Sequence, residues 1–166
     1  MSFKSVILAM FSLLLFCLLG CAGSPTVDHF KGLQGDWELV SFHKHGRIVG
    51  ADAIKQLTVS IRQDRFQMLE KKPGTNPQEF EISIAEDFVL QLDSSKSPAE
   101  MQLVFPTGEK QGQLRRAIYV LEGNELKICA AEIGKATPTE FIANEKAAWS
   151  LYVLNRNEGT GKRKSL

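Results

Sequence analysis

The sequence predicts an all-β fold in which about eight or nine short strands form an antiparallel barrel or sandwich. From residue 33 onward, apolar and polar residues alternate with a period of two, as they do in strands with one face on a core. Clusters of Gly, Pro, Asn and Ser separate these stretches and are typical of turns. No stretch of the same region keeps the helical period over three turns.

Nine stretches carry the alternation, and we expect their apolar members to face the core. The stretches are residues 37–42, 57–62, 65–68, 79–84, 88–92, 101–105, 118–120, 126–128 and 151–153. The apolar members beyond the first stretch are Leu57, Val59, Ile61, Phe66, Met68, Phe80, Ile82, Ile84, Phe88, Leu90, Leu92, Met101, Leu103, Phe105, Ile118, Val120, Leu126, Ile128, Leu151 and Val153. Each strand with its loop takes roughly 14 residues, a spacing that suits a barrel or a sandwich.

The breaks between these stretches contain turn-forming residues. Residues 72–77 include two prolines and a glycine, and residues 94–98 form a Ser-rich break that ends in proline. Residues 122–125 place Gly-Asn between two strands, which predicts a tight hairpin with positive φ. Residues 50–56 predict a single helical turn, for which Asp52 is the expected cap.

The composition indicates one globular domain that disulfides do not hold together. The chain has 166 residues, of which 43% are hydrophobic, and this length allows one domain with a sizeable core. Lys and Arg number 20 and Asp and Glu 19, so no basic field favours nucleic acid, and the low net charge of +1 argues against disorder. Three cysteines are too few for a disulfide-stapled miniprotein.

The first 21 residues have the pattern of a secretory signal. Lys4 is followed by fourteen residues, 6–19, of which only Ser12 is polar, and then by small residues that lead to Cys21. The alternative is an uncleaved membrane helix. Such a helix needs about 20 apolar residues, which the uncharged stretch 5–27 just reaches.

Leu18-Leu19-Gly20-Cys21 resembles the lipobox of bacterial lipoproteins. The resemblance implies cleavage before Cys21 and acylation of its thiol and new amine by fatty acids such as palmitate. Ala22 after the cysteine implies the outer membrane, facing the periplasm. We therefore expect a signal peptide at 1–20, an anchor and tether at 21–31, a barrel at 32–156 and a flexible basic tail at 157–166.

Gly35-Asp36-Trp37, which opens the first strand, is similar to the G-x-W signature of lipocalins. That resemblance implies a lipocalin-like antiparallel barrel of about eight or nine strands in which Trp37 closes one end and an Arg of the last strand packs over it. Arg156 is the expected partner. An Arg above a Trp face contributes about 0.5–2 kcal/mol.

The stretch from Leu33 to Arg156 also resembles a lipocalin-like domain family of uncharacterised proteins abundant in planctomycetes. The matching pieces are Leu33–Ser41, Asp93–Pro98, Ala117–Cys129 and Thr137–Phe141, in the family's order and spacing. Ala117 stands where the family commonly has Gly, and Ala136 where it often has a charged residue. The family has no established activity, so the resemblance bears on the fold and leaves the function open.

No motif in the sequence indicates catalysis, a cofactor or a metal. His43 and His45 share a strand face, but with no third ligand nearby they fit a solvated strand end better than a metal pair. Gly159-Thr-Gly-Lys162 lacks the spacing and the Ser or Thr of a phosphate-binding loop. Cys129, without a partner if Cys21 is acylated, is expected to be a small buried hydrophobe rather than a reactive thiol.

Two charged groups have competing interpretations. Glu79, Glu81, Glu86 and Asp87 fit a solvated face, because nothing in the sequence puts any of these carboxylates in the apolar setting that raises a catalytic pKa. Residues 162–164, Lys-Arg-Lys, fit a solvated tail, with anionic lipid headgroups as the alternative partner. We therefore expect no enzyme activity and no cofactor.

Two functions remain equally open. The first is a non-enzymatic binder whose barrel holds a small apolar ligand. The second is a structural or interaction module whose interior is packed with side chains. Six large apolar residues are numerous enough to fill a small barrel; they are Phe66, Met68, Phe80, Phe88, Phe105 and Trp149. A cavity of several hundred Å³ with apolar walls distinguishes the binder from the module.

The lipobox gives a direct prediction about the mature protein. A mass spectrum of the protein purified from its own host should show a chain that begins at an acylated Cys21. An unmodified Cys21, or a chain that still begins at Met1, would contradict the lipoprotein assignment.

Overall fold

A computed structural model describes residues 30–74 and 80–158 of the chain. Residues 30–33 are helical, and the remaining described elements are strands apart from one short helix, α3. The elements are β1 (Gly35–Lys44), β2 (Arg47–Ile48), α3 (Ala51–Ile54), β3 (Leu57–Arg62), β4 (Arg65–Pro73), β5 (Phe80–Asp93), β6 (Ala99–Val104), β7 (Leu114–Glu122), β8 (Glu125–Ala131) and β9 (Trp149–Arg156).

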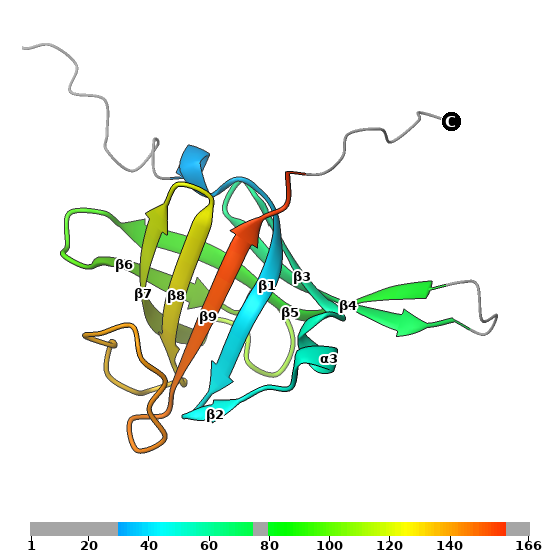
Figure 1. Cartoon of the computed structure of the whole chain (residues 1–166). Coiled ribbons are helices and arrows are strands. Elements are labelled where there is room, and N and C mark those ends of the chain that lie inside the picture. Colours follow the sequence, from blue (N-terminus) through cyan, green and yellow to red (C-terminus); the bar gives the residue numbers. More distant parts are fainter. Residues whose placement is uncertain (1–29, 75–79, 159–166) are drawn as a thin grey trace, which may run out of the picture.

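The strands form a closed antiparallel barrel of eight strands, with β2 as an additional short strand beside β1. Neighbours along the chain pair from β3 to β9, and β1 pairs with both β3 and β9, which closes the sheet (Figure 1). The predicted all-β antiparallel barrel is confirmed. An eight-stranded barrel has an interior just wide enough for side chains to fill.

The barrel interior is packed with apolar side chains through most of its length. Trp37, Ile61, Leu126 and Leu154 have no exposed surface, and Phe88 is 1% exposed. Phe88 packs against two other rings, with ring centroids 6.0 Å from Phe66 and 4.8 Å from Phe105. Of the six residues considered as filling, Phe66, Met68 and Phe88 are buried in the core and Phe105 packs against it. Trp149 is only partly buried, and the side chain of Phe80 is not among those that the structure describes.

Two strands turn the opposite face inward from the one the alternation predicts. On β9 the buried residues are Ser150, Tyr152 and Leu154, so Leu151 and Val153 face outward. On β7 the inward residues include Ala117 and Tyr119, and Ile118 faces outward although it is only 1% exposed. The cause on β7 is the 132–148 segment, which packs outside the wall, where the Cys129 thiol donates a hydrogen bond to Ile142 O (3.2 Å). Because both faces of β7 are covered, alternation cannot identify the inner one.

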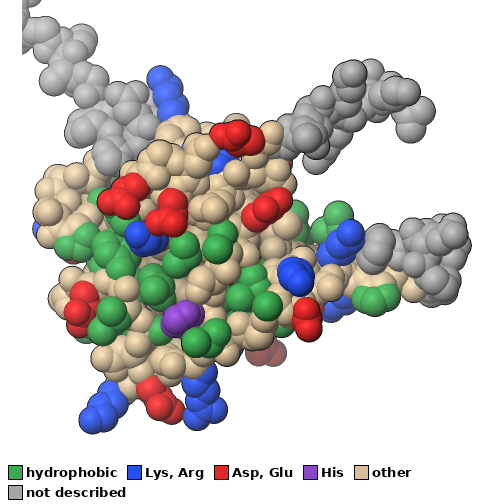
Figure 2. Space-filling view, in the orientation of Figure 1, with side chains coloured by type: hydrophobic (Ala, Val, Ile, Leu, Met, Phe, Trp, Pro, Cys, Tyr) green, Lys and Arg blue, Asp and Glu red, His purple; other side chains and the backbone are tan. Residues whose placement is uncertain are grey.

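The outer surface of β9 and β1 consequently carries apolar side chains. Val40 is 53% exposed, and Leu151 and Val153 are half-buried. Figure 2 shows hydrophobic side chains gathered over β8, β9 and β1 on this face. Val40 faces outward because it alternates with the inward Leu39, and it is also the extra residue of a bulge, since Leu39 pairs with Leu154 and Ser41 already pairs with Val153.

Residues 80–93 form one strand of 14 residues rather than the two strands predicted. A bulge lies at Ala85, because Met68 pairs with Glu86 while the next residue of β4, Leu69, pairs with Ile84. The extra residue reverses the direction of the side chains before it. Ile84 is therefore 56% exposed although Phe88, at the same parity, is buried. Ile82 has the same outward orientation as Ile84 and is 71% exposed, so the expectation that both face the core is wrong.

Two further local expectations differ from the structure, and a third is confirmed. The first strand runs from Gly35 to Lys44 and turns into the unpredicted strand β2. The helical turn predicted near residues 50–56 is α3, but its N-cap is Gly50 and no side chain caps it, so Asp52 lies in the first turn instead. The predicted hairpin at residues 122–125 is confirmed. Glu122 pairs with Glu125, and Gly123 supplies the positive φ of 61° that an L-residue adopts with difficulty.

The bulge at Ala85 predicts unequal costs for two substitutions on β5. Phe88→Ala removes a ring that is 1% exposed, and we expect the free energy of unfolding to fall by about 3–5 kcal/mol. Ile84→Ala removes a side chain that is 56% exposed, and a change within about 0.5 kcal/mol is expected. Urea denaturation measures both values. Equal costs would show that Ile84 faces the core.

Candidate ligand sites at the two ends of the barrel

Trp37 and Arg156 lie together at the end of the barrel where the described chain begins and ends. The guanidinium carbon of Arg156 is 4.2 Å from the centre of the Trp37 ring, and the indole Nε1 donates to Leu33 O (3.0 Å). Arg156 Nη2 donates to Gly32 O at 2.6 Å, and Nη1 donates to Gln34 O. The arginine therefore ties the entering chain to the last strand across the face of the tryptophan.

Gly35 fits this arrangement for two reasons. Its φ is +135°, a conformation that residues with a Cβ rarely adopt. A Cβ built on Gly35 would lie 3.0 Å from Arg156 Nη1. Gly35, Trp37 and Arg156, the three residues that the lipocalin resemblance singles out, are thus brought into one contact group.

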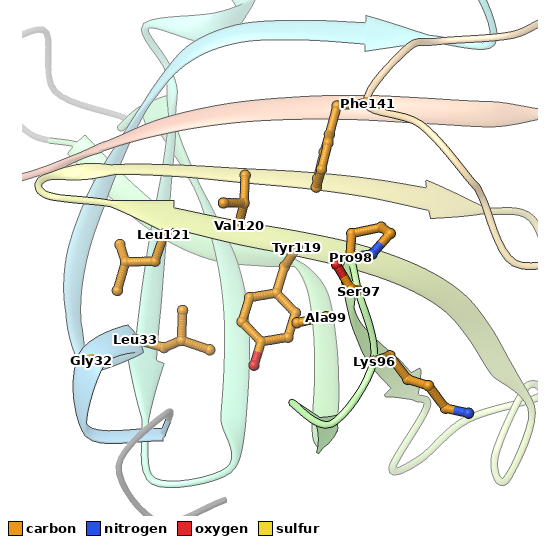
Figure 3. Close-up of a pocket in the computed structure, with 10 residues that line it drawn as sticks. All are labelled: Gly32, Leu33, Lys96, Ser97, Pro98, Ala99, Tyr119, Val120, Leu121 and Phe141. Atoms are coloured by element: carbon orange, nitrogen blue, oxygen red, sulfur yellow. The ribbon is translucent and has the colours of Figure 1, made fainter. Parts of the chain in front are cut away.

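A pocket of about 540 Å³ lies beside this closed end. Its walls come from Gly32 and Leu33, residues 96–98, the start of β6, residues 119–121 of β7, and Phe141 of the 132–148 segment. Figure 3 shows Tyr119 and Leu121 on the side of β7 that carries Leu33, and Val120 on the side that carries Phe141. The pocket therefore wraps around the rim of the wall, and most of its lining side chains are apolar.

The polar groups of this rim pocket are few. Burial raises the pKa of Tyr119, and the nearby carboxylate of Asp93 adds to the shift, so the phenol is neutral at pH 7. Asp93 itself is held by Ser95, whose hydroxyl and backbone N–H both donate to Oδ1 and lower the pKa of the carboxyl. Lys96 extends away from the apolar walls in Figure 3. An apolar molecule would meet little unpaired polarity here.

Charged side chains lie inside the wall at the opposite end of the barrel. Arg115, 4% exposed, donates from Nε to Ala131 O (3.0 Å) and from Nη1 to Tyr152 Oη (3.4 Å). Glu86 Oε1 lies 3.7 Å from Nη1, and Glu132 Oε1 lies 3.7 Å from Nη2. At these distances the opposite charges attract each other, but the distances are too long for hydrogen bonds. The group lines a cavity of about 260 Å³.

Burial and mutual attraction set different protonation tendencies in this cluster. Burial raises the pKa of Glu86 despite the opposing charges of Arg115 and Lys44. Burial also acts on Glu132, but Arg115 and His45 outweigh it and the pKa of Glu132 is lowered. Burial raises the pKa of Tyr152 to about 12, so this phenol stays neutral. The cavity thus holds a fixed cation between an ionised carboxylate and one that takes up a proton more readily.

Glu86 departs from the solvated face expected for the acidic residues near it. Glu86 pairs with the buried Met68 and shares the parity of the inward Phe88, so its side chain lies on the inner side of the wall. Asp87 faces outward and pairs with Arg65, which lowers the pKa of the carboxyl. Glu81 is exposed, and Glu79 lies outside the described residues.

The remaining candidates from the sequence have ordinary surroundings. His45 Nε2 lies 3.0 Å from Glu132 Oε1, and the ring is partly exposed. Cys129 is buried, and burial raises the pKa of its thiol to about 11, well above that of a reactive thiolate. Within residues 30–74 and 80–158, no group of three or more His, Cys, Asp or Glu could hold a metal ion. In the same residues, no helix is both long and apolar enough to cross a membrane. Cys21 and residues 159–164 lie outside the described residues.

Sequence reasoning missed the polar side chains of Arg115 and Ser150, which face inward and are 4% and 1% exposed. The inward direction of Arg115 could have been predicted, because Arg115, Ala117 and Tyr119 alternate along β7 and so share one face. That parity was hidden by Ile118 and Val120, which are apolar because another segment covers them.

No protein family model, curated protein or solved structure matches this chain. The sites therefore rest on their own geometry.

The contacts of Arg156 predict that lysine cannot replace it. Arg156→Lys keeps the charge but loses the planar fork that bonds two carbonyl groups above Trp37, and we expect a loss of about 1–3 kcal/mol in unfolding free energy. Arg62→Lys is the matched control, because Arg62 is 56% exposed where it pairs with Asp36 and such pairs contribute about 0–1 kcal/mol. Chemical denaturation compares the two. A loss for Arg156→Lys no larger than for the control would refute the role given to the fork.

Proposed function

We propose that this protein is a lipid-anchored lipoprotein of the cell envelope, in the outer membrane facing the periplasm, and that its barrel domain binds a small apolar molecule without catalysing a reaction. The observation that carries the proposal is the rim pocket of about 540 Å³ beside Trp37 and Arg156. Its volume lies in the range of small-molecule sites, and its walls are mainly apolar, as such sites usually are.

The packed core supports the rim, rather than the middle of the barrel, as the binding place. Buried side chains from Trp37 through Phe88 to Tyr152 occupy the interior. A ligand in the middle would have to displace well-packed side chains, each of which stabilises the fold by about 2–5 kcal/mol. A ligand in the rim pocket displaces only solvent.

The place of the pocket in the chain agrees with a membrane anchor. Gly32 and Leu33, which line the pocket, belong to the helical residues 30–33, and residues 22–29 lie between these and the expected anchor at Cys21. Eight such residues span at most about 30 Å when fully extended. An acylated Cys21 would therefore keep the pocket close to the lipid surface, where apolar molecules are concentrated.

A second function, an interaction module without a ligand, is favoured by the outer face of the barrel. Val40 and Ile142 are 53% and 44% exposed, and Figure 2 shows further hydrophobic side chains on this side. Exposed apolar patches often mark protein contacts. The binder is preferred because the rim pocket is concave, whereas this face is a barrel wall.

A neutral apolar dye tests the binder directly. N-phenyl-1-naphthylamine should bind the protein and gain fluorescence. Val120→Asp places a carboxylate on the pocket wall, and we expect the dye affinity to fall about tenfold or more, because an unpaired charge against an apolar ligand must be desolvated. Fluorescence titration measures the affinity.

Val153→Asp is the control, since it makes the same substitution at a half-buried outward position of β9 that does not line the pocket. Its dye affinity should equal that of the unchanged protein. Lack of dye binding, or equal losses in the two variants, would favour the interaction module. Native mass spectrometry of protein from its own host then searches for the natural ligand.

A further inference from the structure

We propose that the charged cavity at the opposite end of the barrel is a second binding site, which takes the carboxylate head of a small amphiphile between Arg115 and Ser150. This site and the rim pocket have no lining residue in common. The inference is thus independent of the proposed apolar ligand.

The hydroxyl of Ser150 is the first observation. Ser150 is 1% exposed, lies on the inner side of β9 and lines the cavity. Its Oγ has no hydrogen-bond partner among the residues that the structure describes. A buried polar atom left unpaired costs about 1–3 kcal/mol, so native proteins rarely keep one without a reason. A ligand atom that accepts the hydroxyl proton supplies such a reason.

Arg115 is the second observation. Its side chain is 5% exposed, and Nη2 lies 3.7 Å from Glu132 Oε1, beyond hydrogen-bonding length. Only two hydrogen bonds from the guanidinium occur within the described residues, one to Ala131 O and one to Tyr152 Oη. Since a guanidinium has five N–H donors, it keeps donors for an incoming group.

The unused groups select an acceptor-rich anion. Arg115, the Ser150 hydroxyl and the neutral phenol of Tyr152 all have hydrogens to donate in one cavity. A carboxylate has two oxygens with about four acceptor positions, and it pairs with a guanidinium better than a neutral group does. A cationic head would instead be placed beside the buried charge of Arg115.

The neighbouring charges permit an anion. Lys44 lines this cavity and also an adjoining one of about 350 Å³, into which Lys110 projects as a second lining cation. Glu86, Glu132 and Glu70 are the carboxylates that face the site. Burial already raises the pKa of Glu86, so an incoming anion would favour a proton on Glu86 and turn it into a further donor.

The rest of the cavity accepts a short hydrocarbon tail. Phe42, Leu57 and Met68 line it next to the charged groups, and the Phe42 ring stacks on Tyr152 with centroids 4.5 Å apart. Its volume of about 260 Å³ is small, and the core below it is filled. A medium-chain alkanoate combines the required head with a tail of modest size.

The test compares octanoate with octan-1-ol, which has the same chain and no carboxylate, by isothermal titration calorimetry on the full protein. We expect octanoate to bind at least tenfold more tightly than octanol. Ser150→Ala should weaken octanoate about fivefold or more without lowering the unfolding midpoint, because the removed hydroxyl has no partner in the unliganded protein. Ser41→Ala, on the outward face of β1, should leave the octanoate affinity unchanged.

Two further variants separate this site from the rim pocket and from the fold. Arg115→Met should abolish the preference for octanoate, and if it does not fold, Ser150→Ala still decides the question. Val120→Asp should leave octanoate binding intact. Equal affinities for octanoate and octanol, full octanoate affinity in Ser150→Ala, or octanoate binding that Val120→Asp removes would each overturn the proposal.

Discussion

The pairing of β1 with β9 is the contact on which the rest of this structure depends. Without it the remaining pairings describe an open sheet with two exposed edges. Closure brings Trp37 opposite Arg156 in the register, so the cation over the indole ring lies on the seam. The same closure encloses Phe88, Leu126 and Leu154. Core, capped end and both cavities therefore depend on the joining of the first and last strands of the barrel.

Two single-residue bulges then decide what the wall presents to each side. The bulge at Val40 lets Leu39 and Phe42 both face inward while Val40 faces solvent. The bulge at Ala85 turns Ile84 outward, whereas Glu86, which follows the bulge, keeps the inward parity of Phe88 and lies 3.7 Å from Arg115 Nη1. With unbroken alternation, Ile84 would have faced the interior on the same side as Glu86. One extra residue in β5 thus puts Ile84 in solvent, while Glu86 lines the charged cavity.

These features explain how far the sequence could be read. Alternation at Leu57, Val59 and Ile61 and the Gly-Asn turn after β7 depend on local residue types, so strand positions and the hairpin were predictable. The inner face of β7 was not, because Ile118 is apolar for a tertiary reason, the covering 132–148 segment. The charged cavity depends on residues from β5, β7 and β9 meeting after closure, and no spacing along the chain records that meeting. Gly35, Trp37 and Arg156 were accessible only through resemblance, since nothing local connects residues 37 and 156.

The filled middle of the barrel makes its two ends chemically distinct. The side chains packed between Trp37 and Tyr152 leave no continuous channel through which one molecule could extend from end to end. The end near the chain's entry carries apolar walls and a neutral phenol, whereas the other end carries Arg115 with three carboxylates. If the tether holds the first end near a bilayer, the second end points toward the aqueous side, where a charged head is soluble. Each end then offers a surface suited to the medium it faces, and the packed core keeps the two independent.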